Sequence, residues 1–280
     1  MSIPSNPRAV VTGGAGGLGR AFCLELARRG GRMVVADIDA AGAAETVALV
    51  ERAGGRAFAT TCDVAKLDQV ERLAALADEQ LGGCDVLINN AGVAVGGAVG
   101  AVPIADWEWI MGINLWGVIY GCHVFVPRFK QQGRGHVINV ASAAGLLSAG
   151  EMGPYNVTKA GVVALSETLA SELRTHGVGV TVLCPTFFRT NISKSSRTTN
   201  NDGARAMVEK LMDRAKIQAD GVARVALETA DRGELYAVPH ADGHWMWRLK
   251  RLVPERYYRT IVPKLMGAMR KRTGTTGDQP

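Results

Sequence analysis

Short apolar runs alternate with longer segments of helical periodicity along most of this chain. The runs are rich in Val, Ile and Ala, and they cover residues 9–11, 32–36, 57–62, 86–92, 136–142, 178–185 and 234–238. Strands that are buried on both faces have this composition, and parallel strands need a crossover helix between them. The alternation therefore predicts an α/β fold built on a single parallel, doubly wound sheet.

The charges divide the chain into a neutral body and a basic tail. Residues 1–240 carry 23 basic and 23 acidic side chains, whereas residues 241–280 carry 9 and 3. A length of 280 residues fits one large α/β domain. We place this domain, which holds the predicted binding and catalytic residues, at 1–240. We interpret 241–280 as a basic, aromatic C-terminal extension and not as an independent domain.

A strand, a glycine-rich turn and the start of a helix follow one another near the N-terminus. The strand at 9–11 leads into the turn at 12–19, and apolar residues then recur at helical spacing. Such a turn lets backbone N–H groups and a helix N-terminus approach a pyrophosphate without interference from Cβ atoms. The contacts expected from this turn come from Gly13, Ala15, Gly17, Leu18 and Gly19.

Asp37 directly follows the second strand, a little under twenty residues after the last glycine of the turn. A carboxylate at this place accepts hydrogen bonds from the adenosine ribose hydroxyls and repels a 2′-phosphate. Asp39 competes for the role, and we favour Asp37 because it follows the strand at once. No Arg or Lys occupies residues 14–18, so we expect NAD rather than NADP.

Two polar positions after the next strands each allow two interpretations. Asp63 is either the N-cap of a helix that starts near Lys66 or a cofactor contact. The amides of Asn89 and Asn90 either tie neighbouring strands together or line the cofactor cleft.

Asn114 is the one polar residue among apolar neighbours in a long helix predicted over 107–130 and interrupted late by Pro127. A buried amide in the middle of a helix needs a partner or a water. Asn114 therefore marks either a locally satisfied kink, which the residues alone favour, or part of a polar relay.

A hydroxyl, a phenol and an ammonium group lie close together in the central part of the chain. Ser142 ends the strand predicted at 136–142, where open α/β sheets bind ligands. Pro154 suits the first turn of a helix, which places Tyr155 and Lys159 four residues apart on one face. An ammonium group near a phenol lowers the phenol pKa from about 10 toward neutral pH. A tyrosine needs this property to exchange a proton with an alcohol.

The sequence predicts neither a membrane-spanning segment nor a secretory leader. Five cysteines stand singly, without the spacing of a disulfide framework or a zinc site. Small buried side chains are the favoured interpretation of these cysteines. We therefore expect a cytoplasmic protein with no metal site.

Five motifs follow one another in a characteristic order and spacing. They are Thr12-Gly13-x-x-x-Gly17-x-Gly19, Asn89-Asn90-Ala91-Gly92, Asn114, Ser142 and Tyr155-x-x-x-Lys159. Together they resemble the single-domain short-chain dehydrogenase/reductase family, over roughly residues 8–240. The resemblance implies a Rossmann-type doubly wound sheet of seven parallel strands with helices on both faces, and a nicotinamide cofactor across its carboxyl edge. It also favours the relay interpretation of Asn114.

The resemblance implies a role for each member of the catalytic set. Tyr155 would be the general acid/base, and Lys159 would lower the Tyr155 pKa and hold the nicotinamide ribose. Ser142 would hydrogen-bond the substrate oxygen, and Asn114 would anchor a water in a proton relay. The implied cofactor contacts beyond the glycine-rich turn are Asp37, Asp63, Val64, Asn90, Ala91, Gly92, Tyr155, Lys159, Pro185, Phe188 and Thr190.

One position departs from the family pattern. The family usually has Gly after the proline that ends the sixth strand, and this chain has Thr186. A side chain at the nicotinamide end can narrow the cleft or reshape the loop that follows.

The candidate substrate contacts are Ser142, Ala144, Leu146, Met152 and Phe187. All but Ser142 are apolar, so we expect a lipophilic secondary alcohol or ketone, bulky or steroid-like, and an NAD-dependent alcohol dehydrogenase or ketone reductase. The alternative is a catalytically weak NAD-binding sensor or scaffold with the same fold.

The helices expected at 107–130 and 155–175 match those that the family uses to pair subunits, which implies a homodimer or homotetramer. Aromatic residues beside basic ones in the tail are compatible with a membrane surface or nucleic acid. The resemblance favours packing against a neighbouring subunit or over the substrate cleft. We therefore expect no nucleic-acid partner, and we rank membrane contact below packing within the protein.

Overall fold

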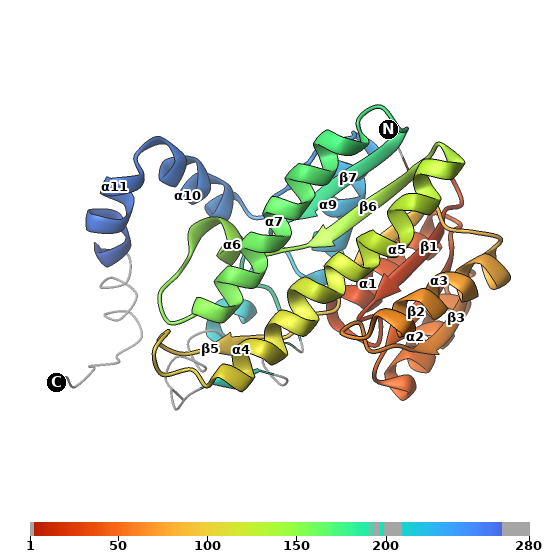
Figure 1. Ribbon diagram of the computed structural model, residues 1–280, viewed down its shortest axis with the longest axis horizontal. Coiled ribbons are helices and arrows are strands. Elements are labelled where there is room, and N and C mark those ends of the chain that lie inside the picture. The colour runs from red at the N-terminus through yellow and green to blue at the C-terminus, as the bar shows by residue number, and fades with distance from the viewer. Residues whose placement is uncertain (1–2, 191, 193–195, 199–208, 265–280) are drawn as a thin grey trace.

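A computed structural model of the chain describes residues 3–190, 192, 196–198 and 209–264. Within them, seven parallel strands form one sheet in the order β3-β2-β1-β4-β6-β7-β9 (Figure 1). The strands are β1 Arg8–Thr12, β2 Arg32–Asp37, β3 Arg56–Thr61, β4 Val86–Asn89, β6 Gly135–Val140, β7 Val178–Leu183 and β9 Tyr236–Ala237. From β1 the chain adds β2 and β3 on one side. It then crosses to β4 on the other side of β1 and adds β6, β7 and β9 in turn. The predicted doubly wound, Rossmann-type sheet is therefore confirmed.

Successive residues in each strand contribute to different cores on the two faces of the sheet. Val10 and Val34 belong to one apolar core, and their neighbours Val11 and Val35 belong to the other. The first core is covered by α3 (Leu67–Leu81), α5 (Gly117–Gln132) and α7 (Gly153–Leu173), and the second by α1 (Gly17–Arg28), α2 (Ala40–Arg52) and α9 (Ala219–Asp231). This two-sided burial explains why the strands read as continuous apolar runs.

The helix predicted over 107–130 is longer and more complex in the structure. It runs as α4 (Ile104–Met111), a π-helical turn η1 (Gly112–Trp116) and α5. The predicted interruption at Pro127 is wrong, because α5 continues through this proline to Gln132. Proline removes only one backbone donor, and the buried aromatic and aliphatic side chains of α5 keep the helix in place.

By length and composition, the segment Ile104–Gln132 is apolar enough to cross a bilayer, which corrects the expectation drawn from the sequence. Half of its most apolar stretch is buried inside the protein. A core helix of a globular fold has the same character.

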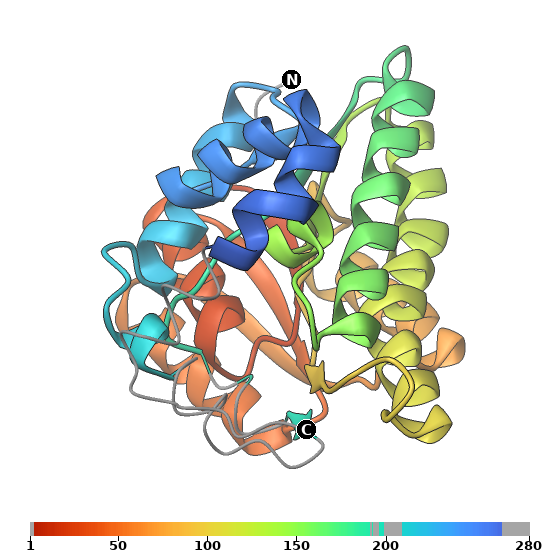
Figure 2. The same ribbon diagram turned by 90° about the vertical axis from the view of Figure 1, so that its left-hand side faces the viewer.

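The C-terminal extension begins with α10 (Ala241–Leu252), α11 (Pro254–Arg256) and a second π-helical turn η3 (Tyr257–Ile261). It lies beside the short helix α6 (Ala143–Leu147), as both views show (Figures 1 and 2). Lys250 Nζ donates a hydrogen bond of 2.7 Å to Leu146 O at the end of α6. The Lys250 ammonium also lies over the Tyr258 ring. The described part of the extension thus packs on the body of the same chain.

Candidate active site

The carboxyl edge of the sheet gathers the loops that carry the predicted site residues. The strand order reverses between β1 and β4. Ligands of open α/β sheets bind at such a topological switch point. The loop after β1 and the loop after β4 are tied together here. Thr12 Oγ1 accepts from the backbone N–H of Asn90 and of Ala91, at 3.0 and 3.2 Å.

The two asparagines that follow β4 both tie strands and loops together. Asn89 Nδ2 donates to Asn139 Oδ1 at 2.9 Å across to β6. Asn90 Nδ2 donates to the carbonyls of Thr12 and Gly13 at 2.9 and 3.0 Å. The structural interpretation of these amides is therefore confirmed, and it places Asn90 against the glycine-rich turn, where the cofactor contact was predicted.

The glycine-rich turn is packed so closely that side chains are excluded from it. Gly13 has φ of +64°, and a Cβ on Gly19 would lie 2.0 Å from Gly13 O. Ala15 N, in the same turn, donates to Asp37 Oδ2 at 2.9 Å. Gly17 opens α1, and Leu18 is buried in the core behind the turn. The result is a cradle of bare backbone at a helix N-terminus, the arrangement that suits a phosphate group.

Asp37 and Asp39, the two candidates for binding the ribose, accept different hydrogen bonds. Asp39 is the N-cap of α2, where its side chain accepts from Gly42 N at 3.0 Å. Asp37 ends β2 and holds the backbone N–H groups of Ala15 and Asp39. This geometry supports the choice of Asp37, because of the two carboxylates only Asp37 is bonded to the glycine-rich turn in the described residues.

Asp63 and Val64 follow β3. The proposed N-cap role of Asp63 is wrong, because α3 starts at Leu67 with Lys66 as its N-cap. Asp63 Oδ1 instead accepts from Ala65 N at 3.0 Å within the preceding turn. Val64 is buried.

Ser142 lies at the N-terminus of a helix that the sequence did not reveal. It is the N-cap of α6, and its Oγ accepts from Ala144 N at 3.1 Å. The same hydroxyl lies 3.5 Å from Pro185 O. It is also near enough to the Tyr155 phenol to act toward a lower Tyr155 pKa. The structure therefore brings Ser142 and Tyr155 together.

Tyr155 and Lys159 lie four residues apart in α7, as predicted, with Pro154 in the first turn. Lys159 Nζ is 5.7 Å from the centre of the Tyr155 ring and donates to Val140 O at 2.8 Å. Burial raises the pKa of Tyr155, although the Ser142 hydroxyl acts in the opposite direction. Burial also lowers the pKa of Lys159 to about 8.

These directions correct the expectation that Lys159 lowers the pKa of Tyr155. The ammonium group of Lys159 is directed at the end of β6, and desolvation dominates at the phenol. The pair is thus close enough to act together, but both groups are biased toward their neutral forms.

Asn114 lies in the π-helical turn and is fully buried. Its side chain accepts from Val93 N at 2.8 Å and donates to Val93 O at 2.9 Å, which pins the loop after β4 to the helix. A π turn shifts the helical hydrogen-bond ladder by one residue and is frequent at functional sites. The amide is therefore satisfied by a separate loop and not within its own helix, so the interpretation as a locally satisfied kink is wrong. A Cβ on Gly92 would lie 3.3 Å from Asn114 Oδ1 and 3.5 Å from Lys159 Nζ.

The loop after β7 closes the site from the other side. Pro185 O accepts from Ala143 N at 2.9 Å, which joins this loop to α6. Phe188 is buried with its ring stacked on His240, at a centroid distance of 6.4 Å. Thr190 Oγ1 accepts from Ile192 N at 3.1 Å.

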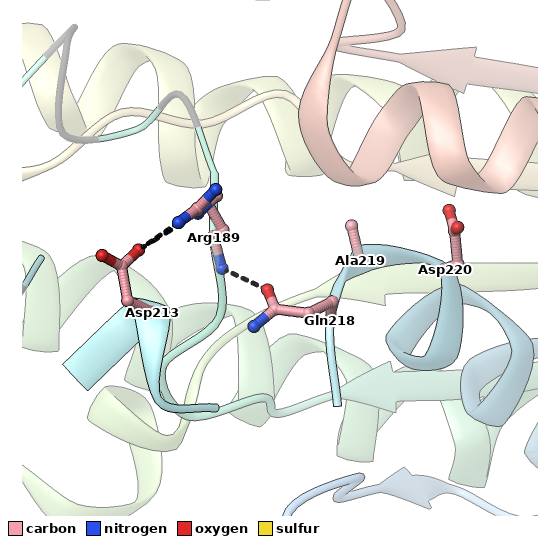
Figure 3. A pocket seen from close by; sticks show the side chains of 5 residues that line it. All are labelled: Arg189, Asp213, Gln218, Ala219 and Asp220. Carbon is pink, nitrogen blue, oxygen red and sulfur yellow. Dashed lines mark hydrogen bonds and ion pairs between the residues drawn. The ribbon is translucent and has the colours of Figure 1, made fainter. Parts of the chain in front are cut away.

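A pocket of about 390 Å³ lies next to this loop (Figure 3). Its lining residues are Arg189, Asp213, Gln218, Ala219 and Asp220. Arg189 and Asp213 form an exposed ion pair of 2.8 Å, and such pairs contribute little to stability. Its lining residue Arg189 precedes Thr190 in the chain, and neither Ser142 nor Tyr155 lines the pocket. The pocket therefore does not contain the candidate catalytic residues.

The candidate substrate contacts surround α6 and the start of α7. Ala144 is partly exposed in α6, and Leu146 is buried. Met152 is the N-cap of α7 and bridges to Gly97. Phe187 is 38% exposed after β7. Three of these residues lie within 144–152, close to Ser142 in the chain, and Phe187 comes from the loop after β7.

Sequence reasoning missed two residues of this region. His240 bonds the loop after β7, and Lys250 holds the end of α6. One signal was present, since His240 and His244 are four residues apart at a spacing that metal sites use. In the structure, the two ring nitrogens of His240 bond Thr186 N and Ile217 O instead.

Comparisons with known proteins agree with this geometry. A family model described as short chain dehydrogenase matches residues 7–201. The probable oxidoreductase EphD of Mycobacterium tuberculosis is 29% identical over 253 residues, or 88% of this chain and 43% of EphD. The chain thus spans less than half the length of that relative. The 1-deoxy-11-beta-hydroxypentalenate dehydrogenase of Streptomyces exfoliatus is 37% identical over 180 residues, or 63% of this chain and 66% of that enzyme.

A solved structure extends the similarity to nearly the whole chain. The short chain dehydrogenase/reductase from Burkholderia phymatum in complex with NAD matches with a TM-score of 0.85 and 34% identity, over 91% of this chain and 96% of that one. The matched family model spans the glycine-rich turn, Asn114, Ser142, Tyr155 and Lys159. The chain therefore belongs to the short-chain dehydrogenase family.

Proposed function

We propose that the protein is an NAD-dependent oxidoreductase that interconverts a lipophilic secondary alcohol and its ketone. The observation that carries the proposal is the convergence of Ser142, Tyr155 and Lys159 beside the Asn114 turn, at the same sheet edge as the glycine-rich cradle. We assign residues 1–240 to binding and catalysis, and 241–280 to an extension that supports them.

The residues at this edge fit a dinucleotide. A Cβ on Gly13 would lie 2.7 Å from Ala91 Cα, and one on Gly19 would lie 2.0 Å from Gly13 O, so only glycine permits this tight turn. The turn leads directly into the N-terminus of α1, where backbone N–H groups would bind a pyrophosphate. Asp37 is placed at the end of β2 for the ribose hydroxyls. Bound NAD would supply the hydride chemistry that amino-acid side chains lack.

The side chains of the chain itself would hold the substrate and move its proton. Ser142 Oγ and the Tyr155 phenol would both hydrogen-bond the substrate oxygen, which fixes the reacting carbon in place. Tyr155 would take the hydroxyl proton during oxidation and return it during reduction. Lys159 would place a positive charge near the phenolate that forms.

The substrate class follows from the side chains near Ser142. Ala144, Met152 and Phe187 offer apolar surface, and such surface favours a lipophilic molecule. A relative named for 1-deoxy-11-beta-hydroxypentalenate is in keeping with a bulky apolar alcohol.

The test is NADH formation at alkaline pH with cyclic, aryl and steroidal secondary alcohols. Turnover of at least one bulky alcohol supports the proposal. Preference for small charged hydroxy acids contradicts the substrate class. Tight NAD binding without turnover across the panel favours a sensor or scaffold instead.

Replacing Asp37 by Asn is expected to raise the ratio of NADP to NAD turnover by about tenfold or more, because a carboxylate next to a 2′-phosphate costs several kcal/mol. Asn keeps an oxygen that can accept from Ala15 N, so the glycine-rich turn should persist. The measurement is kcat/KM with each cofactor. Asp39→Asn is the matched control, since Asn is also a good N-cap for α2. An unchanged ratio in Asp37→Asn together with a changed ratio in Asp39→Asn would assign the ribose to Asp39.

We also propose that subunits pair through the helices α5 and α7. Trp116, next to the start of α5, and Val157, on α7, are each 48% exposed, so each helix presents an apolar side chain that a partner subunit would cover. Sedimentation velocity of the full chain tests this idea. A monomer at micromolar concentration would contradict it.

A further inference from the structure

His240 is a buried hub between three segments of the chain. Its Nδ1 accepts from Thr186 N at 3.3 Å, and its Nε2 donates to Ile217 O at 3.2 Å. Its ring stacks on Phe188, with an angle of 20° between the ring planes. The bonds require one neutral tautomer, with the proton on Nε2. His240 thereby joins the loop after β7 to the chain before α9 and to the start of α10.

Thr186 and Gly243 fit together next to this hub. A Cβ on Gly243 would lie 2.6 Å from Thr186 Cγ2, and real Cβ atoms do not approach that closely. Gly243 is buried in the first turn of α10. The Thr186 methyl group therefore fills the space that a side chain at 243 would need. The side chain that departs from the family pattern is matched by a glycine in the C-terminal extension.

The loop held in this way is the one that faces the candidate site. Pro185 O bonds Ala143 N, and the Ser142 hydroxyl lies 3.5 Å from the same carbonyl. Arg189 N donates to Gln218 Oε1 at 2.9 Å, beside the pocket (Figure 3). A shift of residues 185–190 would therefore change contacts both at Ser142 and next to that pocket.

We propose that His240 and Gly243 are positioning residues, and that the first turn of α10 sets the conformation of the 185–190 loop for cofactor binding. The inference rests on the proposed NAD-dependent function. It assigns the start of the C-terminal extension to the cofactor site, which the sequence motifs did not indicate.

A cycle of variants in the full chain tests the contact. Gly243→Ala places a methyl group against Thr186, and Thr186→Gly removes the obstacle. We expect Gly243→Ala to raise the NADH Kd by about five- to tenfold, a coupling typical of residues in contact. The double variant should return to the Kd of Thr186→Gly alone. His240→Phe keeps the stack on Phe188 but loses both hydrogen bonds, and it should also weaken NADH binding.

Hydrogen exchange of residues 183–190 provides a readout that needs no cofactor. Gly243→Ala and His240→Phe should speed exchange there, and the double variant should restore it. Gly100→Ala and His244→Phe are the controls, because a Cβ on Gly100 has no neighbour within 4 Å and His244 lies one turn beyond the hub. Both controls should match the wild type in exchange and in NADH Kd.

The outcomes separate this inference from the proposed function. Faster exchange with weaker NADH binding, both reversed in the double variant, supports the inference. Faster exchange with an unchanged NADH Kd, or a lower Tm with neither change, would overturn it. A wild-type protein that binds no nicotinamide cofactor would remove the proposed function and this inference with it, and exchange data would still show whether the contact holds the loop.

Discussion

Replacing Tyr155 by Phe is expected to lower kcat for alcohol oxidation by about 10²- to 10⁴-fold, the usual contribution of a positioned general acid/base. Phe keeps the ring in α7 and removes only the phenol hydroxyl, which lies near Ser142. The change therefore removes the group to which we assign the proton transfer, and it should leave the fold undisturbed. NADH affinity should stay within about twofold, since the lost interaction acts in the transition state.

The pH dependence should change in a definite direction. In the proposed mechanism Tyr155 is the base in oxidation and must be deprotonated, and burial raises its pKa above the ordinary value of 10. Oxidation by the wild type should therefore accelerate as pH rises through the alkaline range. The residual activity of Tyr155→Phe should lack this rise. Tyr120→Phe, the same chemical change on α5, is the matched control. A Tyr155→Phe variant that keeps the wild-type pH profile would assign the proton transfer to another group.

The sheet could be predicted because its residues satisfy one local rule. Strands such as Val86–Asn89 and Val178–Leu183 are buried on both faces, and that burial requires unbroken apolar runs. The positions of Asp37 and Ser142 then followed from strand ends, because the functional residues of a parallel sheet gather at its carboxyl edge. The position of Tyr155 followed from helical spacing after Pro154. Sequence order and the helical repeat were sufficient for these positions.

The parts that escaped prediction depend on contacts between distant segments. Helix α6 has only five residues, too few for a periodic pattern, and it is held by Lys250 from the C-terminal extension. The π turn at Asn114 is fixed by both backbone groups of Val93. His240 owes its role to Thr186, and these residues are 54 positions apart in the chain. Local sequence patterns do not predict contacts between such distant residues.

The orientation of Lys159 illustrates the same limit in electrostatics. Spacing placed its ammonium group near the Tyr155 ring, which is correct at 5.7 Å. Spacing could not reveal that Lys159 Nζ would donate a hydrogen bond to Val140 O, or that burial would lower the Lys159 pKa to about 8. The balance between charge pairing and desolvation is decided by the three-dimensional surroundings.

Replacing Lys159 by Met is expected to lower kcat by about 100-fold or more and at the same time to stabilise the protein. A lysine pKa lowered from 10.5 to about 8 corresponds to about 3 kcal/mol of destabilisation at neutral pH, the cost of burying the charge. Met fills similar space without a charge. Leaving Val140 O without its donor costs about 1 to 3 kcal/mol in return, so the net gain should be at most about 2 kcal/mol.

The sign of the pH dependence distinguishes this explanation from ordinary repacking. Between pH 8 and pH 10.5 the unfolded chain still holds the Lys159 proton, whereas the folded chain has lost it. Raising the pH across this window therefore stabilises the wild type at this site. The advantage of Lys159→Met over the wild type, measured by urea unfolding, should be greatest below pH 8 and shrink toward pH 10.5. Lys130→Met, an exposed change on α5, should stay within about 0.5 kcal/mol of the wild type throughout. A Lys159→Met advantage that is constant with pH would show that the buried charge is not what limits stability, and a variant that keeps full activity would remove Lys159 from the proposed mechanism.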